Sequence, residues 1–301
     1  MHPVAKAAAG IAAAGAACFG WGLIERGLYT VRRTELSVLP AGSPDIRVLH
    51  VSDFHLLTRQ RGKQAFLASL AGLKPDLVVN TGDNIAQAAA VEPLMAALEC
   101  LRGVPGVFVF GSNDYYAPHF RNPLRYLTVG PSSSDGDDEP RRELPHRELA
   151  AKLEGLGWTN LTQDRAVLEV AGQRIAFRGT DDAHLERDDY AAVAGPADEA
   201  AVLNVGVTHA PYLRLLDAMT ADGMDLIFAG HTHGGQVCLP GYGALITNCD
   251  LDADRVKGPS THTAGGRTAQ LHVSAGLGTS PYAPYRFACR PEVTLLTLTA
   301  G

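Results

Sequence analysis

The chain has 301 residues, of which 46% are hydrophobic and 19% charged, enough for the core of one large or two small domains. Its formal net charge of −6 argues against a protein that coats nucleic acid, which needs a basic face, so we expect no nucleic-acid partner. The five cysteines are odd in number and form no Cys-x-x-Cys pair. This argues against a thiolate zinc site and a disulfide framework, although a Cys238–Cys289 or Cys249–Cys289 bridge stays open.

The amino-terminal region contains an uncharged run, residues 7–24, that is rich in Ala and Gly. The run is long enough to span a bilayer, although only weakly hydrophobic. Three interpretations are open: a single-pass membrane anchor, a signal peptide cleaved after an Ala14-Gly15-Ala16 site, or a soluble helix packed on the domain. We expect residues 1–33 to form an anchor or signal segment of a membrane-associated protein and residues 34–301 to form the main folded domain.

The charges that flank this run give no single orientation. Arg26, Arg32 and Arg33 outnumber Lys6, so the positive-inside rule alone places the following domain in the cytoplasm. A cleaved signal peptide would place the same domain outside. Both locations therefore stay open.

The first half of the domain alternates apolar runs with helical patterns. We predict strand, helix, strand, helix and strand over residues 47–52, 63–72, 76–81, 92–100 and 107–110. This order is typical of a parallel α/β sheet, in which ligands gather beyond the carboxyl ends of the strands. A polar cluster follows each strand: Asp53 with His55, then Asp83, then Ser112-Asn113-Asp114.

The second half supplies two further strand ends that carry histidine. After a polar, turn-rich loop at 131–142, which we expect to be solvated, the pattern predicts a helix at 147–156 and a hairpin of strands 166–170 and 174–178. A strand at 202–208 ends at His209, a helix follows at 212–221, and a strand at 225–229 ends at Gly230-His231-Thr232-His233. Late strands are expected at 271–274 and 292–299, the second of them antiparallel.

These strand ends together form a set of carboxylate and imidazole ligands. Separately, each residue has an ordinary explanation as a helix cap, a turn residue or a core histidine. Together they suit Mn, Fe or Zn, which accept both oxygen and nitrogen donors, better than Ca or Mg. There are also too many candidate ligands for one ion, so we predict two divalent metal ions bridged by a carboxylate.

The same blocks resemble a known family. Asp53-x-His55, Gly82-Asp83, Gly111-Ser-Asn-Asp114, His209 and Gly230-His-Thr-His233 are similar, in order and spacing, to the signature blocks of the calcineurin-like metallophosphoesterase superfamily. Segments 179–182, 274–280 and 286–292 further resemble its bacterial membrane-associated branch, which includes phosphoesterases similar to UDP-2,3-diacylglucosamine pyrophosphatases. The resemblance implies a four-layer α/β/β/α sandwich of two mixed sheets, preceded here by a hydrophobic helix.

The resemblance also implies roles for the residues. Asp53, His55 and His233 would hold the first metal, Asp83 would bridge both metals, and His209 and His231 would hold the second. A hydroxide that bridges the metals would attack phosphorus in line, with Asp83, Asn113 and Asp114 as the catalytic residues.

One block departs from the family pattern Gly-Asn-His-Asp or Gly-Asn-His-Glu. Here Ser112 aligns with the family Asn, a ligand of the second metal, and Asn113 aligns with the family His, which assists the leaving group. We favour a one-residue shift that makes Asn113 a metal ligand, because an amide oxygen binds metal better than a hydroxyl. The missing His implies slower chemistry, a substitute such as His119 or His184, or a leaving group that needs no proton.

We therefore expect a dinuclear, manganese-type metallophosphoesterase that hydrolyses phosphodiester or pyrophosphate bonds. Lipid-linked phosphoesters are candidate substrates if residues 1–33 anchor the chain in a membrane, and nucleotide phosphodiesters are an alternative. A metal-binding pseudoenzyme that only recognises a phosphorylated ligand, or a structural metal protein, is the competing interpretation.

Overall fold

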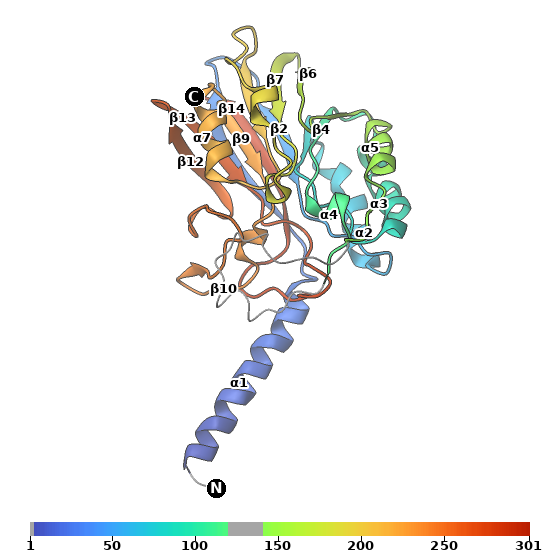
Figure 1. Cartoon of the computed structure of the whole chain (residues 1–301), viewed down its shortest axis with the longest axis vertical. Helices are drawn as coiled ribbons and strands as arrows, with labels where there is room; N and C mark the ends of the chain where they lie inside the picture. The colour runs from blue at the N-terminus through green and yellow to red at the C-terminus, as the bar shows by residue number, and fades with distance from the viewer. Residues whose placement is uncertain (1–2, 120–140) are drawn as a thin grey trace.

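A computed structural model of the chain describes residues 3–119 and 141–301. Most of the loop predicted at 131–142 lies outside these residues. The described part contains two six-stranded sheets, a two-stranded hairpin and a long amino-terminal helix (Figure 1).

The first sheet has a parallel centre and one antiparallel neighbour. Its strands are, in spatial order, β1 (Thr30–Leu39), β14 (Glu292–Ala300), β2 (Ile46–Val51), β3 (Leu77–Asn80), β4 (Gly106–Phe108) and β5 (Trp158–Asn160). Strands β2 to β5 are mutually parallel. Strand β14 pairs antiparallel with β2, as predicted, and parallel with β1.

The second sheet repeats this arrangement. Its strands are, in spatial order, β12 (Gly258–Ala264), β13 (Arg267–Val273), β9 (Leu226–Ala229), β8 (Leu203–Val207), β7 (Gln173–Gly179) and β6 (Arg165–Val170). The four central strands are parallel, whereas β12 and β6 are antiparallel edges. The predicted hairpin is therefore β6–β7. A separate hairpin is formed by β10 (Cys238–Leu239) and β11 (Gly243–Ala244).

Helices cover the outer faces of both sheets. The α-helices are α1 (Pro3–Glu25), α2 (Arg61–Ala68), α3 (Val91–Leu98), α4 (Ser112–Tyr115), α5 (His146–Glu154), α6 (Tyr190–Val193) and α7 (Leu213–Ala221). Short 3₁₀ turns are η1 (Leu70–Leu73), η2 (Ala88–Ala90), η3 (Glu99–Leu101), η5 (Ala183–Leu185) and η6 (His233–Gly235). Helices α2, α3 and α5 lie together beside the first sheet in Figure 1.

Three hydrophobic cores separate four layers. Leu67, Leu94 and Leu149 of α2, α3 and α5 pack on one face of the first sheet. A core that includes Val79 and Val205 lies between the two sheets. Residues of α7 pack on the outer face of the second sheet. The α/β/β/α sandwich of two mixed sheets is therefore confirmed.

Several strands were absent from the sequence prediction. Strand β1 carries Arg32, Arg33 and Glu35, yet it pairs along its whole length with β14, because an edge strand can direct charged side chains to solvent. The expected division between residues 33 and 34 falls inside this strand, so residues 30–33 belong to the first sheet. Strands β5, β10, β11 and β12 were missed as well; three of these four are only two or three residues long.

Helix α1 projects from one end of the sandwich (Figure 1). By length and composition it is apolar enough to cross a membrane, and almost none of it is buried against the rest of the chain. The third interpretation of this segment, a soluble helix packed on the domain, is therefore wrong. All five cysteines are free thiols, so neither of the two bridges left open is formed.

Candidate metal centre

The predicted ligands converge at one edge of the sandwich. Asp53 and His55 follow β2, Asp83 follows β3, His209 follows β8, and His231 with His233 follows β9. Because the central strands of both sheets are parallel, their carboxyl ends can meet at one edge. The structure brings all six of these residues into one buried cluster.

Most of these residues adopt a backbone conformation that L-residues avoid. Asp53, His55, Asp83, His231 and His233 all have positive φ angles, between 41° and 68°. A non-glycine residue in this left-handed region is uncommon and strained, and such strain concentrates at functional sites. The surrounding fold therefore fixes where these five side chains point.

Two glycines allow the loops to come this close. A Cβ atom on Gly230 would overlap the Ser52 hydroxyl and the Asp53 carboxylate, and one on Gly111 would overlap Asp83 and His209. Any larger residue at either position would push the candidate ligands apart.

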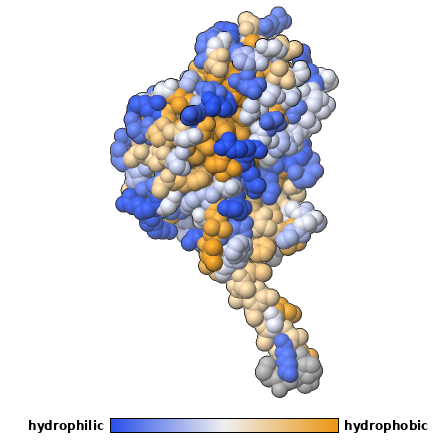
Figure 2. Space-filling view, turned by 180° about the vertical axis from the view of Figure 1, so that it is seen from behind, coloured by the Kyte–Doolittle hydropathy of each residue, from blue (hydrophilic) through white to orange (hydrophobic). Residues whose placement is uncertain are grey.

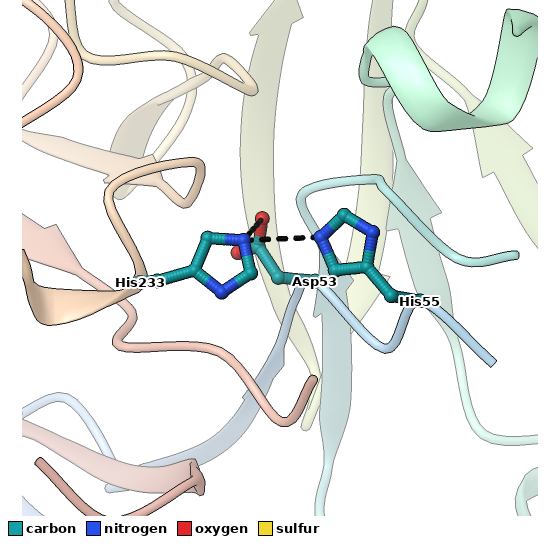
Figure 3. Close-up of side chains that lie close together, drawn as sticks. All are labelled: Asp53, His55 and His233. Atoms are coloured by element: carbon teal, nitrogen blue, oxygen red, sulfur yellow. Dashed lines mark hydrogen bonds and ion pairs between the residues drawn. The ribbon is translucent and has the colours of Figure 1, made fainter. Parts of the chain in front are cut away.

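Asp53, His55 and His233 form the first group of possible ligands (Figure 3). The Nε2 atoms of His55 and His233 are 3.0 Å apart, and Nε2 of His233 is 3.6 Å from Oδ1 of Asp53. The sticks in Figure 3 point toward one another from two separate loops. Their donor atoms suit a single ion that accepts both nitrogen and oxygen.

Asp53, Asp83 and His209 form a second group that shares Asp53 with the first. Oδ2 of Asp83 is 3.4 Å from Nε2 of His55 and 3.6 Å from Nε2 of His209. The same carboxylate oxygen therefore lies between histidines of the two predicted metal shells. Among the described residues, Nε2 of His209 is buried without a hydrogen-bond partner, as expected of an atom that binds a metal ion.

Backbone carbonyl groups orient three of the imidazoles. Nδ1 of His209 lies 2.7 Å from the Thr81 carbonyl oxygen, and Nδ1 of His233 lies 3.2 Å from that of Gly278. Each ring thereby directs Nε2 to the cluster. His231 is turned the other way: its Nε2 lies 3.1 Å from the Asn248 carbonyl oxygen, which makes Nδ1 the candidate ligand atom.

Burial and mutual charge shift the pKa values of the cluster. Burial lowers the pKa of His55 to about 4 and the pKa of His233 well below its usual value, so both are neutral and ready to bind metal. Burial raises the pKa of Asp53 to about 6. Burial would also lower the pKa of His209, but the carboxylates of Asp83, Asp182 and Asp53 outweigh it and raise that pKa to about 9.

Metal binding should therefore release a proton from His209. A metal ligand must be deprotonated, and this imidazole, with a pKa of about 9, is protonated at neutral pH in the metal-free protein. We expect the apparent affinity for Mn²⁺ to rise from pH 7 to pH 9, by at most about tenfold per unit for one proton, and then to level off. Calorimetry in buffers of different ionisation enthalpy measures the protons released; an affinity that is constant over this range would contradict the prediction.

A chain of buried hydrogen bonds supports Asp53 from behind. The Ser52 hydroxyl donates to Oδ2 of Asp53 at 2.5 Å and accepts from Thr81 at 2.7 Å. Nε2 of His50 is 3.1 Å from Oγ1 of Thr81, and its Nδ1 is 2.8 Å from Nδ1 of His272. None of these four supporting residues was predicted from the sequence. Ser52 and His50 stand directly beside the Asp53 motif, but nothing in the sequence connects His272 to it.

Removing the Ser52 hydroxyl should weaken metal binding without unfolding the protein. Ser52→Ala deletes the hydrogen bond that orients Asp53, and the loss of such an outer contact typically reduces metal affinity 10- to 100-fold. We expect a reduction of about tenfold, since the backbone N–H of His231 also bonds both Asp53 oxygens. Calorimetric Mn²⁺ titration measures it, with the exposed Ser69→Ala as control. Equal affinity in both variants would show that the Ser52 contact does not matter.

The loop at 111–114 places two residues differently. The Asn113 backbone and side-chain N–H groups donate to the two Asp83 oxygens at 2.7 and 2.9 Å. Asp114 accepts instead from the backbone N–H groups of Asp83, Asn84 and Gly111, at 2.7, 2.8 and 3.0 Å. Asn113 therefore faces the cluster, whereas the contacts of Asp114 are those of a residue that holds two loops together.

Asp182 and His184 lie on the second-sheet side of the cluster. Within the described part of the chain, Oδ2 of Asp182 is buried without a hydrogen-bond partner, and burial raises the pKa of this carboxyl to about 7. The ring of His184 is 4.7 Å from that of His231, and its Nδ1 is 3.2 Å from the Tyr212 hydroxyl. Of the two substitute histidines suggested by the sequence, His184 is thus in contact with a candidate ligand; His119 stands beside the residues that are not described.

Comparison with known proteins agrees with this geometry. The family model described as calcineurin-like phosphoesterase matches residues 46–235, more than half of the chain. The chain belongs to this family. The protein is therefore a metallophosphoesterase, which is a hydrolase of phosphoesters, and its buried Asp/His cluster suits a metal site. Membership of the family implies that its substrate is a phosphoester. This assignment favours the hydrolase over the pseudoenzyme and the structural metal protein.

Relatives cover nearly the whole length of this metallophosphoesterase. An uncharacterized metallophosphoesterase of Bacillus subtilis (strain 168), YkuE, is 26% identical over 92% of the chain and 86% of its own length. The phosphodiesterase YaeI of Escherichia coli (strain K12) is 24% identical over 91% of the chain and 90% of its own length. Among solved structures, TT1561 of Thermus thermophilus aligns with a TM-score of 0.42 at 10% identity, over 78% of this chain and 91% of that one.

Proposed function

We propose that the protein is a phosphodiesterase that uses two divalent metal ions. The observation that carries the proposal is the position of Asp83, whose Oδ2 atom lies within 3.6 Å of Nε2 of both His55 and His209. A carboxylate between two histidines of different groups is the arrangement expected of a bridging ligand. Asp53, His55 and His233 would hold one ion, and His209, His231 and Asn113 would complete the shell of the other.

The protein groups have their own tasks around the ions. Two bound ions would polarise the phosphoryl group and activate water at neutral pH, a role that suits Mn, Fe or Zn. Asp83 is held ionised for this purpose: burial opposes its charge, but His209 and His55, with hydrogen bonds from Asn113, keep its pKa below the usual value. Asp114 fixes the Asp83 backbone, because its carboxylate accepts a hydrogen bond from the backbone N–H of Asp83. The tightly held loops keep the ligands in place before substrate arrives.

The departure at residue 113 favours particular substrates. An asparagine cannot donate the proton that the family histidine gives to a leaving group. Phosphodiester or pyrophosphate bonds with good leaving groups need no such proton, which supports them as substrates. Similarity to a phosphodiesterase in Escherichia coli supports the diester class. The likeness to the membrane-associated branch, and an apolar α1, support lipid-linked phosphoesters within that class.

Hydrolysis of bis(p-nitrophenyl) phosphate tests the proposal. We expect the full chain, purified in detergent and loaded with Mn²⁺, to hydrolyse this diester and to lose activity when the metal is chelated. The p-nitrophenolate group leaves without protonation, so the absent histidine does not limit this reaction. A folded, metal-loaded protein with no turnover would overturn the proposal.

A further inference from the structure

Exposed apolar side chains are confined almost entirely to one end of the molecule. Among the described residues, every exposed large hydrophobic side chain except Val167 lies on α1, on the segment 239–246 that contains the β10–β11 hairpin, or at Tyr282. The loop residues are Leu239, Tyr242, Leu245, Ile246 and Tyr282, which we call the foot surface. Tyr242, at the tip of the β10–β11 hairpin, is 77% exposed. On the surfaces of soluble proteins, exposed hydrophobic residues are usually scattered singly, whereas here five lie in two segments.

Direct contacts join the foot surface to the end of α1. The backbone N–H of Arg286 donates to the Gly22 carbonyl at 3.0 Å, and the rings of Phe19 and Tyr285 are 5.7 Å apart. The next residue, Phe287, exchanges backbone hydrogen bonds with Gln236 and Cys238, which begin the hairpin. The hairpin and α1 thus flank one short segment, and Figure 1 shows β10 at the end of the body from which α1 leaves.

Hydrophobic colours run along α1 from the body to near its free end (Figure 2). Glu25, at the base of this helix, is buried and accepts hydrogen bonds from the backbone N–H groups of Ala288 and Cys289 at 3.1 and 2.7 Å. The last turn of α1 is therefore part of the folded body. A bilayer that contains α1 would meet the body at the foot surface.

The strand topology places the metal centre at this same end. Strand β1, which follows α1, runs parallel to β14, and β14 runs antiparallel to β2. The amino end of β1 therefore lies beside the carboxyl end of β2, where Asp53 and His55 stand. The hairpin also adjoins the site, because a Cβ atom on Gly235, two residues after His233, would overlap Ala244 of β11. Asn248, four residues after the hairpin, accepts a contact from His231 through its carbonyl oxygen.

We propose that the foot surface docks on the lipid bilayer that holds α1 and keeps the metal centre at the membrane surface. Tyr242 and Tyr282 suit the interface, where tyrosine rings concentrate, and Leu239, Leu245 and Ile246 suit the acyl boundary below it. Exposed Arg26 and Arg290 stand beside the end of α1, where phosphate headgroups would lie. Docking on the bilayer does not depend on the proposed phosphodiesterase activity. The idea that docking brings lipid phosphodiesters to the metal centre does rest on that proposed function.

Fluorescence quenching by brominated lipid tests docking without any need for activity. Tyr242→Trp places a tryptophan probe on the foot surface, and Val167→Trp places a matched probe on β6. Among the described residues, Val167 is the one exposed large hydrophobic residue that lies outside both α1 and the foot surface. Each full-length variant is reconstituted in phosphatidylcholine–phosphatidylglycerol vesicles, and the signal of the parent protein is subtracted. We expect brominated acyl chains to quench the tryptophan at position 242 about twofold and the one at position 167 not at all. Equal quenching at the two positions would overturn the proposal.

Hydrolysis of two diesters separates docking from function. We expect the double variant Leu239→Ser/Leu245→Ser to hydrolyse phosphatidylglycerol in vesicles about tenfold more slowly than the parent, and bis(p-nitrophenyl) phosphate at the parent rate. An equal loss on both diesters would contradict a docking role. If the parent protein hydrolyses neither diester although the tryptophan at 242 is quenched, the proposed function fails and docking stands.

Discussion

Replacing Asp83 with asparagine is expected to lower the turnover of bis(p-nitrophenyl) phosphate by roughly 10³-fold, to the level of the buffer control, since a metal pair supplies several kcal/mol of transition-state stabilisation. The amide is neutral and cannot bridge two cations as a carboxylate does. The substitution also removes the charge that raises the pKa of His209 and holds His55 beside it. In the proposed metal pair, both ions would therefore lose the carboxylate that joins them.

Metal content provides the second readout for this variant. We expect elemental analysis to find two Mn²⁺ ions per chain in the parent and at most one in Asp83→Asn. The control is Asp45→Asn, an identical chemical change at an exposed residue before β2, at the opposite end of that strand from the site. Full activity of Asp83→Asn, or equal losses in both variants, would refute the bridging role.

Replacing Asn113 with alanine is expected to weaken binding of the second Mn²⁺ by roughly 10²-fold, because losing a direct ligand costs at least as much as losing an outer contact. We expect Ser112→Ala to leave Mn²⁺ binding nearly unchanged. The geometry supports this difference, since Asn113 contacts both Asp83 oxygens and Ser112 only the Asn113 side chain. A half-turn of the amide presents its oxygen at the position of its nitrogen.

Calorimetric titration of the two variants distinguishes the two alignments of this loop. If Asn113 is the ligand, the second binding step becomes roughly 10²-fold weaker in Asn113→Ala and keeps its affinity in Ser112→Ala. The reverse result would support the ungapped alignment, in which Ser112 replaces the family asparagine. Circular dichroism provides the folding control for both variants.

The sequence by itself indicated the candidate metal-ligating residues and the chain order of the main strands. Short apolar runs end in Asp53, Asp83, His209 and His231, and this pattern is local, so it is legible without the fold. The parallel α/β order then placed these ends on one edge. Strand β1 was not predicted, because its charged residues do not form a local apolar pattern. It pairs with β14, more than 200 residues away in the sequence.

Only the tertiary structure decided which groups touch. The loops after β2 and β9 meet at Asp53, His55 and His233, and the His50–His272 contact joins residues 222 apart. The tertiary structure also places the end of α1, the β10–β11 hairpin and the candidate metal centre at one end of the molecule. These contacts depend on sheet pairing and strand direction over the whole chain, whereas sequence periodicity reports only which face of its own strand or helix a side chain occupies.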